Sequence, residues 1–169
     1  MKSRFVKANA KPRGFTLVEV LMAAMLIGLA ITALVASSGA FTLYNAAGVD
    51  LSTAEFLIEE IRELTAPLSV VDPVSTTTIF GAEAGETTVA AYDDVDDFNG
   101  QSFNPPVDVE RTQMPEFAAY TQQVAVQNVT PADLTQTAAN HTTDLYRVTV
   151  TITKGGRTIT SASWIRAKY

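Results

Sequence analysis

Four carboxylates within five residues form the densest group of candidate metal ligands in the chain. They lie in residues 92–100, YDDVDDFNG, as Asp93, Asp94, Asp96 and Asp97, with Asn99 and a glycine following. Carboxylates this close repel one another unless water or a cation neutralises them, and Ca²⁺ takes roughly six to eight oxygen ligands. The spacing differs from the EF-hand pattern. Two interpretations stay open: an acidic turn in which an aspartate caps backbone amides, and a Ca²⁺ site with these four aspartates and Asn99 as ligands.

A second carboxylate with unusual surroundings is Glu19. It is the one charged residue in residues 15–36, FTLVEVLMAAMLIGLAITALVA, and the rest of that run is nearly all apolar. A carboxylate at bilayer depth costs about 2.5–3.5 kcal/mol on insertion scales and usually marks a function with a specific partner. The partner is either the positive end of its own helix or a cation on another molecule. Both readings stay open at this point.

The remaining residues give little support to catalysis or nucleic-acid binding. His141 is the only histidine, the chain has no cysteine, and neither Ser37-Ser38-Gly39 nor the glycines match a nucleophile or phosphate-binding motif. We therefore expect His141 to be an ordinary loop residue and the protein not to be an enzyme. The net charge of −6 argues against a nucleic-acid surface, which needs clustered Lys and Arg.

The N-terminal forty residues predict a membrane anchor. Residues 1–14 hold five basic residues and no acidic one, which by the positive-inside rule keeps the N-terminus cytoplasmic. Residues 15–40 form a helix of about 39 Å, enough to cross a hydrocarbon core of about 30 Å. An ordinary secretory signal cleaved near residues 36–38 is the alternative. It is disfavoured because the apolar run exceeds the usual length of about 7–15 residues and the helical pattern continues beyond it.

An amphipathic continuation of the helix is predicted over residues 41–66. Apolar residues recur there at spacings of three and four, which is typical of a helix with one buried face; they are Leu51, Ala54, Leu57, Ile58, Ile61 and Leu64. If Gly48 breaks the helix, Asp50 or Ser52 is placed to cap a restart. Pro67 is expected to end it. As one element, residues 15–65 span about 76 Å.

Residues 67–169 predict a β-rich head. Short strands are possible at 78–80 and 87–91, and better ones at 117–129, 144–153 and 158–166, where apolar and polar residues alternate. Gly155-Gly156 suits a tight hairpin turn between the last two strands. The expected fold is α+β: a long N-terminal transmembrane and stalk helix packed on a small antiparallel sheet.

The residues around the start of the apolar run resemble a known family. The string from Arg13 to Leu21, RGFTLVEVL, is similar to the prepilin cleavage and methylation motif of type IV pilins and type II secretion pseudopilins, and the similarity extends through the helix to about residue 40. It implies that residues 1–14 are a leader removed after Gly14 by prepilin peptidase. Phe15 would become an N-methylated N-terminus, and Glu19 would pair with the N-terminal amine of a neighbouring subunit. It also implies the pilin fold.

Features of the head are similar to a narrower group within this family. The segment 92–100, the proline-rich loop, the strand near Tyr120 and the hairpin ending in Trp164 are similar to the D-type minor pilin of mannose-sensitive haemagglutinin pili. The paired C-terminal cysteines of major pilins are absent. The expected function is a minor pilin, with an assembly-priming or adhesion role, held by one span in a bacterial inner membrane before it joins a filament of other pilins. A type II secretion pseudopilin, a competence pilus subunit and an anchored binding module that never polymerises are the alternatives.

Overall fold

The computed structural model describes residues 14–72 and 79–168. Its elements are α1 (Leu17–Thr65), η1 (Asp96–Phe98), β1 (Ser102–Phe103), η2 (Pro115–Phe117), β2 (Tyr120–Thr130), β3 (Asp133–Thr137), β4 (Leu145–Lys154) and β5 (Arg157–Ala167). This is the predicted α+β arrangement, with one long N-terminal helix and an antiparallel sheet. The chain divides into two compact units, Met1–Ala46 and Ala47–Tyr169, and we describe each by itself.

The helix α1 continues through Gly48 without interruption. The helix is therefore the single element predicted for residues 15–65, and no restart capped by Asp50 or Ser52 is needed. One glycine costs only about 1 kcal/mol relative to alanine inside a helix, which a long run of helix-forming neighbours offsets. The Asp50 carboxylate instead accepts hydrogen bonds from the Tyr120 hydroxyl at 2.7 Å and from Lys154 Nζ at 2.6 Å. The helix ends at Thr65, two residues before Pro67, as expected.

Four strands form an antiparallel sheet in the order β1-β2-β4-β5, and β3 pairs with β2. The three better strand predictions are confirmed, each to within a few residues. The β4–β5 turn is also confirmed, since Gly155 and Gly156 both have positive φ angles, of 56° and 79°, which glycine adopts without steric cost. The short strands β1 and β3 were not predicted.

The predicted strand at 87–91 is wrong, because none of these residues is in a strand and residues 89–91 form a turn. Arg111 Nη1 donates to the carbonyls of Val89 and Ala90, at 3.2 and 3.1 Å, so a side chain from another segment takes acceptors that a strand would use. Of the predicted strand at 78–80, Thr78 lies outside the described residues, and Ile79 and Phe80 are not in a strand.

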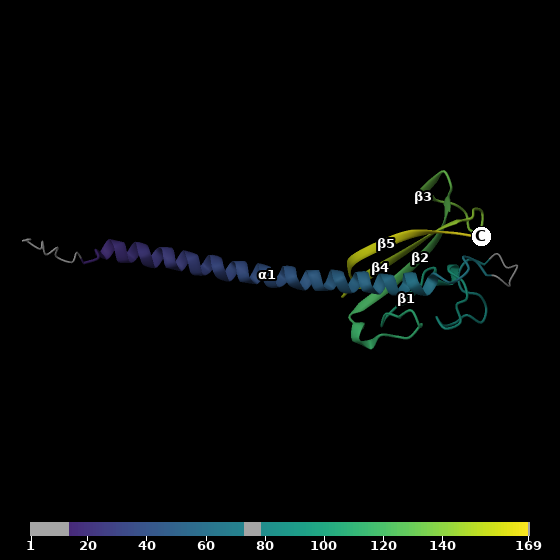
Figure 1. The fold of residues 1–169 in the computed structure, drawn as a ribbon, viewed down its shortest axis with the longest axis horizontal. Helices are drawn as coiled ribbons and strands as arrows, with labels where there is room; N and C mark the ends of the chain where they lie inside the picture. The colour runs from purple at the N-terminus through teal and green to yellow at the C-terminus, as the bar shows by residue number, and fades with distance from the viewer. Residues whose placement is uncertain (1–13, 73–78, 169) are drawn as a thin grey trace, which may run out of the picture. The chain divides into compact units, whose positions relative to one another are not determined.

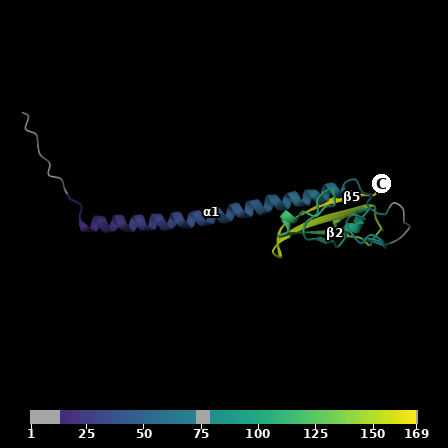
Figure 2. The same ribbon diagram turned by 90° about the horizontal axis from the view of Figure 1, so that it is seen from below.

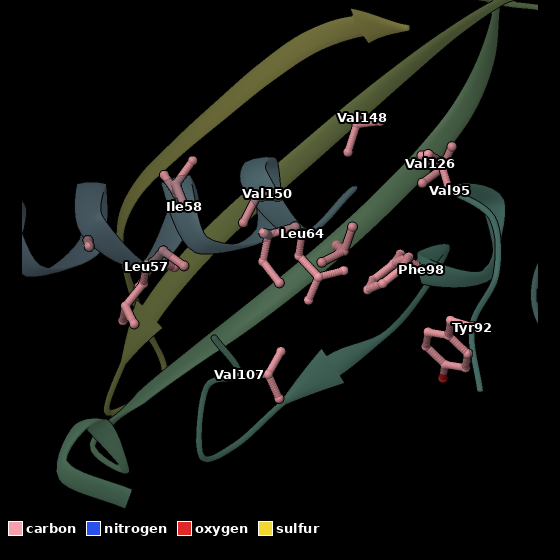
Figure 3. Close-up of a cluster of buried hydrophobic side chains, with 14 of the residues drawn as sticks. Leu57, Ile58, Leu64, Tyr92, Val95, Phe98, Val107, Val126, Val148 and Val150 are labelled. Atoms are coloured by element: carbon pink, nitrogen blue, oxygen red, sulfur yellow. The ribbon is translucent and has the colours of Figure 1, made fainter. Parts of the chain in front are cut away.

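The core of the second unit lies between α1 and one face of the sheet. Figures 1 and 2 show the C-terminal part of α1 running beside the strands, and Figure 3 shows the side chains that meet there. Leu57 and Ile61 from the helix and Val148 and Val150 from β4 are fully buried. Phe98 enters the same core from the loop that precedes β1. The predicted alternation in β4 is confirmed, since every second residue from Tyr146 to Ile152 is buried.

Candidate functional site

Thr16 and Glu19 together form a capping box at the start of α1. The Glu19 amide donates to Thr16 Oγ1 at 3.2 Å, while Glu19 Oε2 accepts from the Thr16 amide at 2.9 Å and from the Thr16 hydroxyl at 3.0 Å. These bonds satisfy amides that the first turn of a helix leaves without partners. Thr16 was not singled out from the sequence, although the Thr-x-x-Glu spacing is a recognised capping signal. Within one chain, Glu19 therefore serves its own helix.

Gly14 and Phe15 lie immediately before this capping box. Both are exposed, and a Cβ on Gly14 would have no heavy atom within 4 Å. The Phe15 side chain is 87% exposed. The backbone at the predicted cleavage point is therefore open to another molecule, within the residues that the structure describes.

The first unit presents an almost wholly apolar helix surface. Every described residue of α1 up to Val49 is exposed, including its leucines, methionines and isoleucines. The helix is long and apolar enough to cross a membrane. Apolar surface of this extent on one element marks contact with lipid or with other protein.

The acidic segment folds into a loop around η1 in which two aspartates accept hydrogen bonds from backbone amides of the same loop. Asp94 Oδ1 accepts from the amides of Asp96 and Asp97, at 2.7 and 3.1 Å. Asp97 Oδ2 accepts from the amides of Asp93 and Asp94, at 2.9 and 3.2 Å. Local amide capping, the first of the two interpretations of this segment, is thus present. It uses one oxygen of each carboxylate.

The structure does not bring all five predicted ligands together. Asp96 Oδ1 accepts from the Gly81 amide at 2.7 Å, and Asn99 Oδ1 accepts from the Val126 amide at 3.0 Å. These bonds attach the loop to neighbouring segments. Neither residue belongs to the carboxylate groups described next.

Two groups of three carboxylates share Asp97. One is Asp93, Asp94 and Asp97, and the other is Glu83, Glu86 and Asp97; in each, the candidate ligand atoms lie within 4.8 Å of one another. The sequence does not single out the two glutamates as ligands, although residues 83–97 hold six acidic residues and no basic one. Their contribution depends on how the chain folds back, so only the loop conformation reveals it.

Burial dominates the electrostatics of this loop. Asp94 and Asp97 are both fully buried. Burial, with the nearby charges of Asp96 and Asp97, raises the pKa of Asp94 to about 8, and the bonds from backbone amides only partly oppose it. Burial and the Glu86 carboxylate raise the pKa of Asp97 to about 7, against the same kind of amide bonds. Desolvation penalises the charged form of an acid, which is the direction of both shifts.

His141 has a structural role. Its backbone has a positive φ of 58°, Nε2 lies 3.1 Å from the Ile79 carbonyl oxygen, and its ring packs edge-on against Phe80 at 5.3 Å between centroids. It stands in none of the carboxylate groups found among the described residues. These contacts agree with the prediction that His141 is an ordinary loop residue.

Comparison with known proteins adds no relative to this picture: no protein family, curated protein or solved structure matches the chain.

Proposed function

We propose that the protein is a minor pilin of a type IV pilus. In this proposal it is made as a precursor, held in a bacterial inner membrane by residues 15–40 with its head in the periplasm, cleaved between Gly14 and Phe15, methylated, and built into the filament. Its partners are the prepilin peptidase and other pilin subunits. We propose a minor rather than a major pilin because the head has no cysteine pair.

The observation that carries the proposal is a single carboxylate at the start of an exposed apolar helix. Glu19 lies in the first turn of α1, four residues after the Phe15 amine that cleavage would create. An amine and a carboxylate in lipid are each costly alone, and both become tolerable when paired. Both capping bonds from Thr16 reach Glu19 Oε2. Capping within the chain is therefore compatible with an amine from a neighbouring subunit at the other oxygen.

Processing is tested by intact mass and N-terminal sequencing of the protein from native membranes. We expect a chain that begins at Phe15 and is heavier by one methyl group. A chain that begins near Ser37, or one that keeps Met1, would remove the pilin assignment.

The assembly step is tested by substitutions that separate charge from capping. Glu19→Gln retains an acceptor oxygen for the Thr16 amide and removes the charge, because glutamine also serves in a capping box. We expect it to insert into the membrane normally and to be lost from sheared filaments. Thr16→Ala removes the hydroxyl partner but keeps the carboxylate, and is expected to remain in filaments. Normal incorporation of Glu19→Gln would contradict the pairing mechanism and leave Glu19 as a helix cap.

A pseudopilin of a type II secretion system would be processed in the same way, so a deletion strain separates the two systems. We expect loss or change of surface pili with normal export of folded proteins. Normal pili with a failure of protein secretion would assign the chain to the secretion system instead.

A further inference from the structure

Two buried carboxylates in the acidic loop each have one oxygen without a partner. Asp94 Oδ2 and Asp97 Oδ1 are buried and accept no hydrogen bond, although the other oxygen of each side chain accepts two from backbone amides. Both side chains are 0% exposed. A buried polar atom without a partner is costly, so such atoms in a folded protein indicate a missing ligand or proton.

Basic side chains of the described residues do not fill this need. The charge of Arg111 lowers the pKa of Asp93, against the rise that burial causes. Its Nη1, however, donates to three backbone carbonyls in the preceding turn, the shortest at 2.6 Å to the Tyr92 oxygen. His141 lowers the pKa of Asp96, and Asp96 already accepts a hydrogen bond from the Gly81 amide. Neither of these basic side chains therefore bonds to Asp94 Oδ2 or Asp97 Oδ1.

Carboxylates from two segments of the described chain meet at Asp97. Asp93 and Asp94 approach Asp97 from the same loop, while Glu83 and Glu86 approach it from the preceding turn. The Glu83 amide donates to Glu86 Oε2 at 2.8 Å, which holds the two glutamates in one tight turn. An all-oxygen donor set with several carboxylates suits a hard divalent cation, and Ca²⁺ takes roughly six to eight oxygen ligands in flexible geometry whereas Mg²⁺ demands a near-ideal octahedron.

We propose that the head binds one Ca²⁺ ion at Asp97, with Asp93 and Asp94 on one side and Glu83 and Glu86 on the other. The two unpartnered oxygens would coordinate the ion, which becomes their partner. It neutralises carboxylates that otherwise repel one another. This ligand set differs from the one predicted from the sequence, since the glutamates replace Asp96 and Asn99.

The ion would fasten the loop to the core. Val95 and Phe98, which flank the ligands, are fully buried in the core of the second unit. The same loop is joined to the rest of the head by bonds from the Val95 amide to the Ser69 carbonyl at 2.9 Å and from the Gly100 amide to the Val124 carbonyl at 3.0 Å. Loss of the ion should therefore loosen core packing as well as the surface turn. This proposal does not depend on the pilin assignment.

The test uses the full-length chain in nonionic detergent micelles, stripped of metal with EDTA and dialysed. Isothermal titration with CaCl₂ measures binding directly. Thermal unfolding is followed by the fluorescence of Trp164, the only tryptophan, which packs against the head core. We expect one ion per chain and, at saturating Ca²⁺, an unfolding midpoint higher by about 5 °C or more. Mg²⁺ at the same concentration should give a smaller shift.

Variants separate a cation from a shared proton. Asp97→Asn keeps an oxygen for the Asp93 and Asp94 amides and should weaken Ca²⁺ binding by about tenfold or more, because affinity follows the number of charged ligands. Glu86→Gln, at a half-buried position, should weaken it in the same direction even if Asp97→Asn folds poorly. Glu116→Gln, at an exposed acid outside the loop, is the matched control and should bind as the wild type does.

Two results would overturn the proposal. The first is no heat of binding and no thermal shift with CaCl₂ in the wild type; if Asp97→Asn is also more stable than the wild type at neutral pH, a proton shared by Asp97 and Glu86 occupies the site. The second is wild-type binding that neither Asp97→Asn nor Glu86→Gln weakens, which would place the ion elsewhere.

Discussion

Gln122 is a buried amide that links three segments of the head, and its replacement should be measurably destabilising. It is 0% exposed. Its Oε1 accepts from the Val107 amide at 2.7 Å. Its Nε2 donates to the Leu57 carbonyl in α1 at 2.9 Å and to the Val107 carbonyl at 3.1 Å. The side chain therefore joins β2, the helix and the loop that carries Val107.

The magnitude follows from these three bonds. Each hydrogen bond contributes about 1 kcal/mol net to the free energy of unfolding, so the loss of three bonds in Gln122→Met lowers it by about 3 kcal/mol. Methionine has a similar length and regains roughly 1 kcal/mol through apolar burial. The backbone partners cannot be replaced, and the Val107 amide is left buried without an acceptor. The expected loss in the free energy of unfolding is about 2 kcal/mol.

Urea unfolding of the full-length chain in micelles, followed by Trp164 fluorescence, measures this loss. Gln123→Met, at the exposed neighbouring position, is the control and should change stability by less than about 0.5 kcal/mol. Equal unfolding midpoints for the Gln122 and Gln123 variants would refute the claim that the buried amide holds the helix and loop to the sheet.

Three further predictions test the core, the hairpin and the acidic loop. Ile61→Ala, at a fully buried helix position, should cost about 3 kcal/mol in urea unfolding, whereas Leu51→Ala, at a 43% exposed position, should cost less than about 1 kcal/mol; similar losses would contradict the buried face of α1. Gly156→Ala should cost about 1 kcal/mol in the same assay, because φ is +79° there, and an unchanged midpoint would argue against this turn geometry. In EDTA the urea midpoint should fall as pH rises. The pKa values of Asp94 and Asp97 are raised from 3.8 to about 8 and about 7, so their contribution to stability is complete below about pH 4 and is lost as pH rises through those values; a midpoint that rises over this range would contradict it.

Local sequence patterns were sufficient for much of the fold. The apolar run and the spacing of Leu57 and Ile61 predict α1 and its buried face, because a helix repeats every 3.6 residues. Alternation in 144–153 and the glycine pair at 155–156 predict the last hairpin, because a strand repeats every two residues and this turn needs positive φ. The segment 87–91 misled the prediction, because Arg111, distant in sequence, takes its carbonyls.

The two candidate sites also differ in how much the sequence alone indicates about them. Gly14, Phe15 and Glu19 are predicted from the resemblance of one short string to the prepilin motif, and their roles stay predictions. The sequence does not predict the arrangement of the acidic loop. The sequence places Asp94 and Asp97 in a charged turn, where a solvated surface is the ordinary expectation, and only the tertiary structure buries both and brings Glu86 to Asp97. Burial and approach between segments depend on which parts of the chain pack together, and spacing along the chain does not determine that.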